Sequence, residues 1–258
     1  AIAGSPGLTG APTLASTAAA RTGAGAVVCA CPQTVQSTLA ARLTEVMTLA
    51  LPVSADGLMP AESMQAIQSR KAQAAAALIG CGLGRLKGTG EFVRNFLQSV
   101  DLPTVVDADA LFALDEAFLL KHGRPNWVLT PHLGEFRRLA GDTSGPLDAV
   151  DTARAFAKKW NVTIILKGAP SVVGCADGSV HINPTGNQAL ASAGTGDVLA
   201  GMCAGYLAQG LRPVDAAMAA LFVGGRTVER FSDQYFRDSL MAGDIVDLLP
   251  QVLAEFST

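Results

Sequence analysis

The sequence predicts an α/β fold in which a central, mostly parallel sheet carries helices on both faces. Short apolar runs typical of buried strands alternate with segments of helical periodicity along the chain, and this alternation favours a parallel sheet. Aromatic residues make up 5% of the 258 residues while 49% are hydrophobic, a composition that suits helices packed closely on a sheet. We therefore expect a single domain over residues 1–258 with a sizeable core.

The first part of the alternation covers residues 1–79. Residues 1–3 look like the tail of a strand that runs into a glycine-rich loop, and we expect this strand to be truncated because the chain does not begin with methionine. A helix from Pro12 to Arg21 should end at the glycines that follow it. The next strands are expected at residues 26–31, 46–51 and 76–79, with helices at residues 33–43 and 61–73 between them.

The alternation continues with strands expected at residues 104–106, 127–129 and 162–166, preceded by helical segments at residues 90–100, 109–121 and 148–160. The run 162–166 is the strongest strand signal, because nearly all of it is β-branched.

The last part of the chain should form one edge of the sheet and the helices that cover it. Residues 171–175 and 179–182 predict a hairpin, since Asp177-Gly178 between them suits a two-residue turn. The sheet should therefore have an antiparallel edge. Three helices are expected to follow, at residues 197–209, 213–230 and 244–249. The first of them is apolar nearly all round, so we expect it to be buried.

The most informative motif is Gly194-Thr195-Gly196-Asp197, which stands directly before that apolar helix. Glycines let the backbone turn with positive φ, and the free N–H groups of a first helical turn attract negative charge. The motif can thus hold a phosphate with Asp197 beside it as a base. The alternative is that Asp197 only caps the helix, which is a common role for aspartate.

Other polar residues follow the strands, at the edge where open parallel sheets bind ligands. Lys167-Gly168-Ala169-Pro170-Ser171 leaves the strongest strand and could line a nucleotide, or could be a plain turn. His132 and Glu135 should stand one helical turn apart on one side, as a substrate or hydrated-metal contact or as a capping pair. Asp107 and Asp109 could serve a hydroxylated ligand or magnesium through water, or one of them could cap a helix. Residues 183–187 could complete the pocket wall.

Composition and missing motifs exclude several functions. The net charge of −3 gives no global basic field for nucleic acid or a membrane surface. No run reaches the roughly 18 to 20 apolar residues of a membrane span, so we expect a cytoplasmic protein. The five cysteines are scattered through apolar segments and receive no role, and the three histidines lack zinc-site spacing. G-x-S-x-G and Walker motifs are absent from the sequence.

Six motifs in this order resemble the ADP-dependent NAD(P)H-hydrate dehydratase family, over nearly the whole chain. They are Gly4-Ser5-Pro6-Gly7-Leu8-Thr9-Gly10-Ala11, Ile79-Gly80-Cys81-Gly82-Leu83-Gly84, Val106-Asp107-Ala108-Asp109-Ala110-Leu111, Leu129-Thr130-Pro131-His132-Leu133-Gly134-Glu135-Phe136, Lys167-Gly168-Ala169, and residues 183–187 through 194–201. The sequence departs modestly from the family at Cys81 and Leu133, where proline is usual, and at Gln188-Ala189, where Pro-Gly is frequent.

The resemblance implies a ribokinase-like fold without a lid domain and a lyase that repairs nicotinamide nucleotides. The hydroxyl of (6S)-NAD(P)H hydrate would be phosphorylated by ADP or ATP and then leave as phosphate, a far better leaving group than hydroxide. Asp197 would take the hydroxyl proton, while N–H groups at Gly194, Thr195 and Gly196 stabilise the transferring oxygens. Magnesium would neutralise the nucleotide phosphates.

The same matching implies which residues bind each substrate. Residues Lys167, Gly168, Ala169, Pro170, Ser171 and Gly196 would hold the nucleotide. Residues Ala11, Gly82, Gly84, His132 and Asp197 would face the hydrated dinucleotide, with Asp107 as an additional contact. Glu135 would meet the metal through water. The resemblance also implies a homo-oligomer, with a tetramer as one form, and relatives with an amino-terminal epimerase domain.

The main alternative is a small-molecule kinase of the same superfamily, of the hydroxyethylthiazole or pyrimidine-alcohol type. Such a kinase would use Gly194 to Asp197 equally well, because phosphorylating a hydroxyl is the shared first step. The segment Thr130 to Glu135 and the glycine-rich opening loop match the dehydratases better. An inactive binding protein would be expected to lose Asp197 or the glycine turn, and both are present.

Overall fold

The computed structural model of the chain describes residues 1–54, 59, 61–85, 88–141 and 148–256. Six strands form a sheet in the order β3-β4-β5-β6-β7-β8, and two more pair as β1-β2. The strands are β1 (Val28–Pro32), β2 (Met47–Leu51), β3 (Ala77–Ile79), β4 (Thr104–Val106), β5 (Trp127–Leu129), β6 (Thr163–Leu166), β7 (Val172–Gly174) and β8 (Val180–Ile182). Pairing is parallel from β3 to β6 and antiparallel from β6 to β8, which confirms the predicted antiparallel edge.

Ile2 joins the two groups of strands. It forms parallel bridges to Ala30 of β1 on one side and to Ile79 of β3 on the other. Its N–H donates to the carbonyl of Leu78 at 2.7 Å, and its carbonyl accepts from the N–H of Gly80 at 3.1 Å. The expected strand at residues 1–3 is therefore a short link that extends the parallel part of the sheet.

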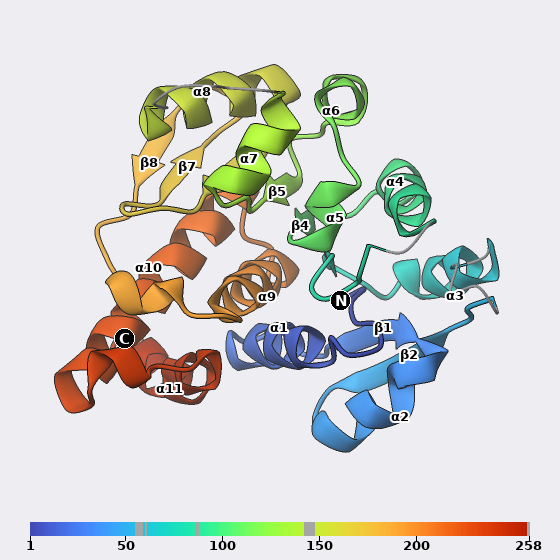
Figure 1. The fold of residues 1–258 in the computed structure, drawn as a ribbon, viewed down its shortest axis with the longest axis horizontal. Helices are drawn as coiled ribbons and strands as arrows, with labels where there is room; N and C mark the ends of the chain where they lie inside the picture. Colours follow the sequence, from blue (N-terminus) through green and yellow to red (C-terminus); the bar gives the residue numbers. More distant parts are fainter. Residues whose placement is uncertain (55–58, 60, 86–87, 142–147, 257–258) are drawn as a thin grey trace.

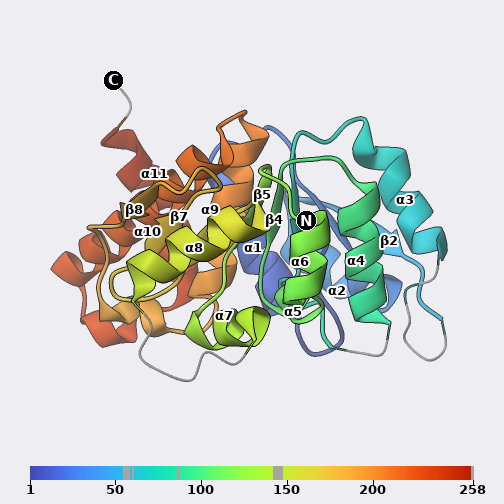
Figure 2. The same cartoon turned by 90° about the horizontal axis from the view of Figure 1, so that it is seen from above.

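Helices cover both faces of the sheet, as Figure 1 and Figure 2 show. The α-helices are α1 (Gly10–Arg21), α2 (Gln33–Arg42), α3 (Ala61–Lys71), α4 (Thr89–Ser99), α5 (Asp109–Phe112), α6 (Glu116–His122), α7 (Leu133–Ala140), α8 (Ala149–Trp160), α9 (Thr195–Ala208), α10 (Pro213–Gln234) and α11 (Ala242–Ala254). Two short 3₁₀ helices, η1 (Gln188–Ala191) and η2 (Arg237–Ser239), complete the description. None of the described helices is long and apolar enough to cross a membrane.

Alternate residues of the strands point to two separate cores. Leu78, Val105 and Val128 pack with α1, α9, α10 and α11, whereas their neighbours Ile79, Val106 and Leu129 pack with α4 to α8. This alternation is the two-residue period of a strand, and both sets are apolar because both faces of a parallel sheet are covered. As predicted, α9 is buried on most of its surface.

The boundaries of two helices, α9 and α11, differ clearly from the sequence predictions. The helix expected from Asp197 begins two residues earlier, at Thr195, and the helix expected at 244–249 extends over Ala242–Ala254 even though it contains Pro250. The last helix is longer because its apolar face packs on the same core as α1, α9 and α10, which outweighs the propensity cost of one proline.

Close contact between α1 and α9 depends on small residues, and this generates a test. A Cβ at Gly201 would collide with the backbone carbonyl of Ala15, so Gly201→Ala should lower the free energy of unfolding by about 1 to 3 kcal/mol. Gly243 in α11 has open space around it, so Gly243→Ala should leave stability equal or slightly higher. Urea unfolding of both variants measures the difference; equal midpoints would contradict the close packing.

Candidate active site

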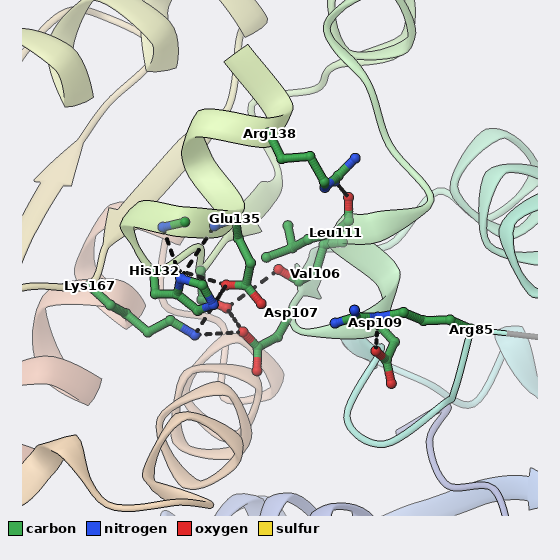
Figure 3. A network of polar contacts seen from close by, with 11 residues as sticks. Arg85, Val106, Asp107, Asp109, Leu111, His132, Glu135, Arg138 and Lys167 are labelled. Atoms are coloured by element: carbon green, nitrogen blue, oxygen red, sulfur yellow. Dashed lines mark hydrogen bonds and ion pairs between the residues drawn. The ribbon is translucent and has the colours of Figure 1, made fainter. Parts of the chain in front are cut away.

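Three neighbouring strands end in side chains that meet around one carboxylate (Figure 3). Asp107 follows β4, Thr130 follows β5 and Lys167 follows β6. The Thr130 hydroxyl donates to Asp107 Oδ1 at 2.5 Å, and Lys167 Nζ lies 3.0 Å from the same oxygen. The carboxylate of Asp107 is only 2% exposed, so the ion pair is buried at the carboxyl edge of the sheet. Burial lowers the pKa of Lys167, but Asp107 and Glu135 outweigh this and keep the pKa above its usual value.

Asp197 lies next to this ion pair. The Cys81 thiol is 3.9 Å from Asp107 Oδ2, and ligand atoms of Cys81, Asp107 and Asp197 all lie within 4.8 Å of one another. Burial, and then the negative charge of Asp107, raises the pKa of Asp197 to about 6; the thiol hydrogen bond and Lys167 act in the opposite direction. A carboxylate with a pKa near neutrality can accept a proton during a reaction and release it afterwards.

The glycine turn places Asp197 in the first turn of α9. Gly194 is the N-cap residue with φ of 89°, and no side chain caps the helix. The alternative in which Asp197 is only an N-cap is therefore wrong: Asp197 is the third helical residue and Gly194 takes the capping position, because the turn needs the positive φ that glycine allows. First-turn N–H groups have no acceptor within their helix, so those of Gly196 and Asp197 face the open end of α9.

Lys167 brings a positive charge to the same glycine turn. Its Nζ would lie 3.4 Å from a Cβ placed on Gly196. The helix N-terminus and the ammonium group therefore converge on one location, which favours an anion such as a phosphoryl group. The side chain of Thr195 does not face this location, since its hydroxyl is within hydrogen-bond distance of the carbonyls of Leu190 and Ser192.

His132 and Glu135 form a capping box at the start of α7. His132 Nδ1 accepts from the N–H groups of Gly134 and Glu135, and Glu135 Oε2 accepts from the N–H of His132 at 2.9 Å. The side chains share one side of the helix, as expected, with 3.5 Å between His132 Nε2 and Glu135 Oε2. The capping interpretation is confirmed, and 59% of the His132 side chain remains exposed.

The predicted dinucleotide contacts Ala11, Gly82 and Gly84 lie together. Gly82 has φ of 61°, and a Cβ there would lie 3.1 Å from the Ala11 side chain. Gly84 has φ of 78° and donates its N–H to Asp109 Oδ2 at 2.9 Å. The glycines therefore let the loop after β3 pack directly against the start of α1.

The nucleotide loop expected at residues 167–171 divides into two parts. Gly168, Ala169 and Pro170 are exposed, and the Ser171 hydroxyl closes the turn on the backbone of Gly168. The Lys167 side chain instead points to Asp107. Asp107 has three protein partners, so in this structure it holds Lys167; its contact with substrate stays a prediction.

Cys81 and Thr130, which have no role predicted from the sequence, both lie in the cluster around Asp107. Thr130 directly follows β5 and Cys81 comes two residues after the end of β3, and this position at the ligand-binding edge is the signal that could have identified them. Residues 183–187 are anchored to α10: the Gly186 N–H donates to Glu229 at 2.8 Å and Asn187 Nδ2 donates to Ser232 at 2.9 Å.

The fold and the site define the class of protein. The sheet is mostly parallel with an antiparallel hairpin edge, and a carboxylate lies behind a glycine turn at the start of a buried helix. A ribokinase-like superfamily protein from Enterococcus faecalis has the same fold, with a TM-score of 0.83, 24% identity, and coverage of 99% of this chain and 86% of that chain.

Sequence comparison gives the family. The family model described as NAD(P)H-hydrate dehydratase matches residues 1–251. The chain is 33% identical over 254 residues to the ADP-dependent (S)-NAD(P)H-hydrate dehydratase of Xanthomonas campestris, covering 98% of this chain and 86% of that protein. The chain belongs to the NAD(P)H-hydrate dehydratase family, so the predicted resemblance is confirmed.

Two further relatives with dehydratase or repair-enzyme names are similar to this chain. The ADP/ATP-dependent NAD(P)H-hydrate dehydratase of Bacillus subtilis, co-crystallised with ATP and Mg²⁺, has a TM-score of 0.79 at 30% identity, over 99% of this chain and 88% of that chain. The bifunctional NAD(P)H-hydrate repair enzyme of Salinibacter ruber is 46% identical over 259 residues, which is 98% of this chain. The chain spans 47% of that enzyme, about half its length.

The raised pKa of Asp197 predicts a stability effect with a definite pH dependence. Because the folded-state pKa of about 6 exceeds an unfolded value of about 4, the ionised carboxylate destabilises the fold increasingly between these pH values and fully above them. Asp197→Asn should therefore raise the free energy of unfolding at pH 8 by on the order of 1 to 3 kcal/mol, with little change at pH 4. Urea unfolding at both pH values measures this.

Asp151 is a matched control for this variant. It is also the third residue of its helix, α8, but its side chain is 76% exposed. Asp151→Asn should show no gain that grows with pH. A gain for Asp197→Asn that is equal at pH 4 and pH 8 would contradict the raised pKa.

Proposed function

We propose that this protein uses ADP or ATP to dehydrate (6S)-NAD(P)H hydrate to NAD(P)H. The observation that carries the proposal is the position of Asp197, a carboxylate with a pKa of about 6 in the first turn of α9, beside the Lys167 ammonium group. A base of this kind next to an anion-binding helix terminus suits phosphorylation of a hydroxyl group. Membership of the NAD(P)H-hydrate dehydratase family supports the hydrate as the substrate.

The reaction has two stages. Asp197 removes the proton of the hydrate's hydroxyl as that oxygen attacks the terminal phosphoryl group of the nucleotide, and the bond from phosphorus to the bridging oxygen breaks. The N–H groups of Gly196 and Asp197, with Lys167, stabilise the charge on the transferring oxygens. Phosphate then leaves with the electrons of its bond to carbon, and loss of a proton from the adjacent ring carbon restores the double bond.

A carboxylate suited to contact with hydrated magnesium, that of Glu135, lies next to this site. Glu135 Oε2 accepts from the His132 N–H, and the other oxygen of Glu135 has no hydrogen-bond partner among the described residues. A carboxylate oxygen of this kind can accept a hydrogen bond from a water molecule bound to Mg²⁺. Glu135 would hold the ion through water, and the ion would neutralise nucleotide phosphates.

The remaining assignments follow the family. Residues 167–171 and Gly196 would contact the nucleotide, and Ala11, Gly82, Gly84 and His132 would face the dinucleotide. The Bacillus subtilis relative was crystallised with ATP and Mg²⁺, which supports both as ligands here. We also propose that the protein is a homo-oligomer, and a sizing measurement tests this.

The activity is tested with hydrated NADH or NADPH, ADP or ATP, and magnesium. Absorbance of the reduced nicotinamide should return while an equal amount of phosphate appears. Asp197→Asn should lower kcat by at least about a hundredfold, because the base is lost, with little change in nucleotide affinity. Asp151→Asn should behave as wild type.

The acid limb of kcat should follow the pKa of Asp197, so activity should fall below about pH 6. If the protein instead phosphorylates a thiazole or pyrimidine alcohol and leaves the hydrate unchanged, the proposal is wrong. Near-wild-type turnover by Asp197→Asn would remove Asp197 from the base role.

A further inference from the structure

Arg85 is an exposed cation that the proposed chemistry does not use, yet the structure holds it firmly (Figure 3). Its Nε donates to Asp109 Oδ1 at 2.8 Å, and its guanidinium carbon lies 3.4 Å from the ring centroid of Phe112. The other oxygen of Asp109 accepts the N–H of Gly84, so one carboxylate fixes both the glycine loop and the arginine. The side chain is 55% exposed, and its terminal nitrogens have no partner among the described residues.

A second guanidinium approaches the same ring. The guanidinium carbon of Arg138 lies 4.5 Å from the Phe112 centroid. Its terminal nitrogens donate to the backbone carbonyls of Leu114 and Leu111, and no described carboxylate lies within 4 Å of it. Burial, and then the positive charge of Arg85, lowers the pKa of Arg138, while Glu135 and Asp115 act in the opposite direction.

Two guanidinium groups thus lie beside the Phe112 ring, and Asp109 pairs with one of them, in a chain whose net charge is −3. Two guanidinium groups near one ring repel each other, and the carboxylates of Asp109, Glu135 and Asp115 offset part of this repulsion. Arg85 is held by two specific contacts while more than half of its side chain stays exposed. A rigid guanidinium with free terminal nitrogens suits a phosphate, which it can bind through two parallel hydrogen bonds.

The position of Arg85 indicates which ligand would supply the phosphate. It directly follows Gly84, in the loop that carries Gly82 and packs against Ala11. The negative charge of its partner Asp109 contributes to the raised pKa of Asp197. The nucleotide loop at residues 167–171 leaves a different strand, β6, and Lys167 already provides its cation. The loop after β3 is therefore the place for the dinucleotide rather than for ADP or ATP.

We propose that Arg85, supported by Asp109 and Phe112, binds a phosphate group of the dinucleotide substrate and helps to determine its affinity. This inference rests on the proposed function. Two groups of the dinucleotide have the required chemistry, the pyrophosphate of both NADH and NADPH forms and the 2′-phosphate of the NADPH form alone.

The test measures NADPH and NADH binding by calorimetry, which needs no turnover. Arg85→Gln removes the charge and should weaken NADPH binding about tenfold or more, as expected for loss of a charge-assisted contact. Arg85→Lys keeps the charge without the planar fork and should fall between wild type and Arg85→Gln. With the hydrates as substrates, KM should rise by the same factor while kcat stays within about twofold of wild type.

Arg94 provides a matched control. It also pairs with an aspartate, Asp115, at 2.8 Å and lies 5.4 Å from the centroid of a phenylalanine, Phe118, but on α4 rather than in the glycine loop. Arg94→Gln should bind both dinucleotides within about twofold of wild type. Circular dichroism of each variant verifies that it is folded.

The binding results distinguish the pyrophosphate from the 2′-phosphate as the group that Arg85 contacts. Weakened binding of NADPH alone supports the 2′-phosphate, and equal weakening of NADPH and NADH supports the pyrophosphate. The inference is overturned if wild type binds neither dinucleotide, if Arg85→Gln binds both as wild type does, or if Arg94→Gln has the same effect. Arginine-dependent binding without any dehydration would instead overturn the proposed function and leave the phosphate site standing.

Discussion

The buried ion pair between Asp107 and Lys167 is the interaction on which the site depends. It connects the ends of β4 and β6 across β5, where Thr130 donates to the same carboxylate oxygen. A buried carboxylate without a cation would be strongly destabilising, so Asp107 requires Lys167 to stay close. The same contact holds the ammonium group at the glycine turn, and the charge of Asp107 helps to raise the pKa of Asp197.

Parallel pairing makes this arrangement possible. In a parallel sheet every strand delivers its following residue to the same edge, so groups far apart in the chain converge without long loops. The register pairs Val106 with Leu129 and Leu129 with Ile164, which sets Asp107, Thr130 and the end of β6 side by side. Glycines then let two further segments approach this edge of the sheet. Gly194 turns the chain into α9, and Gly82 lets the loop after β3 pack on Ala11.

Much of this could be predicted from sequence. Strand periodicity located the strands of the sheet, and the Asp-Gly turn located its antiparallel edge. The ordered motifs identified the family and brought Asp197, Gly196 and Lys167 into one hypothesis. Helix ends were less accurate, because tertiary packing extends α11 through Pro250 and because the positive φ of Gly194, rather than the carboxylate of Asp197, starts α9.

The sequence by itself determined the fold class and the family, because periodicity and the order of motifs can be read directly from the chain, and it predicted Asp197 as the base. Only the tertiary structure decided which side chains touch. In the folded chain, Lys167 pairs with Asp107, and Cys81 and Thr130 contact the same carboxylate. Glu135 belongs to a capping box, and the guanidinium group of Arg85 packs on the ring of Phe112. These contacts depend on strand register and helix packing, and no local pattern encodes the distance between residues on different strands.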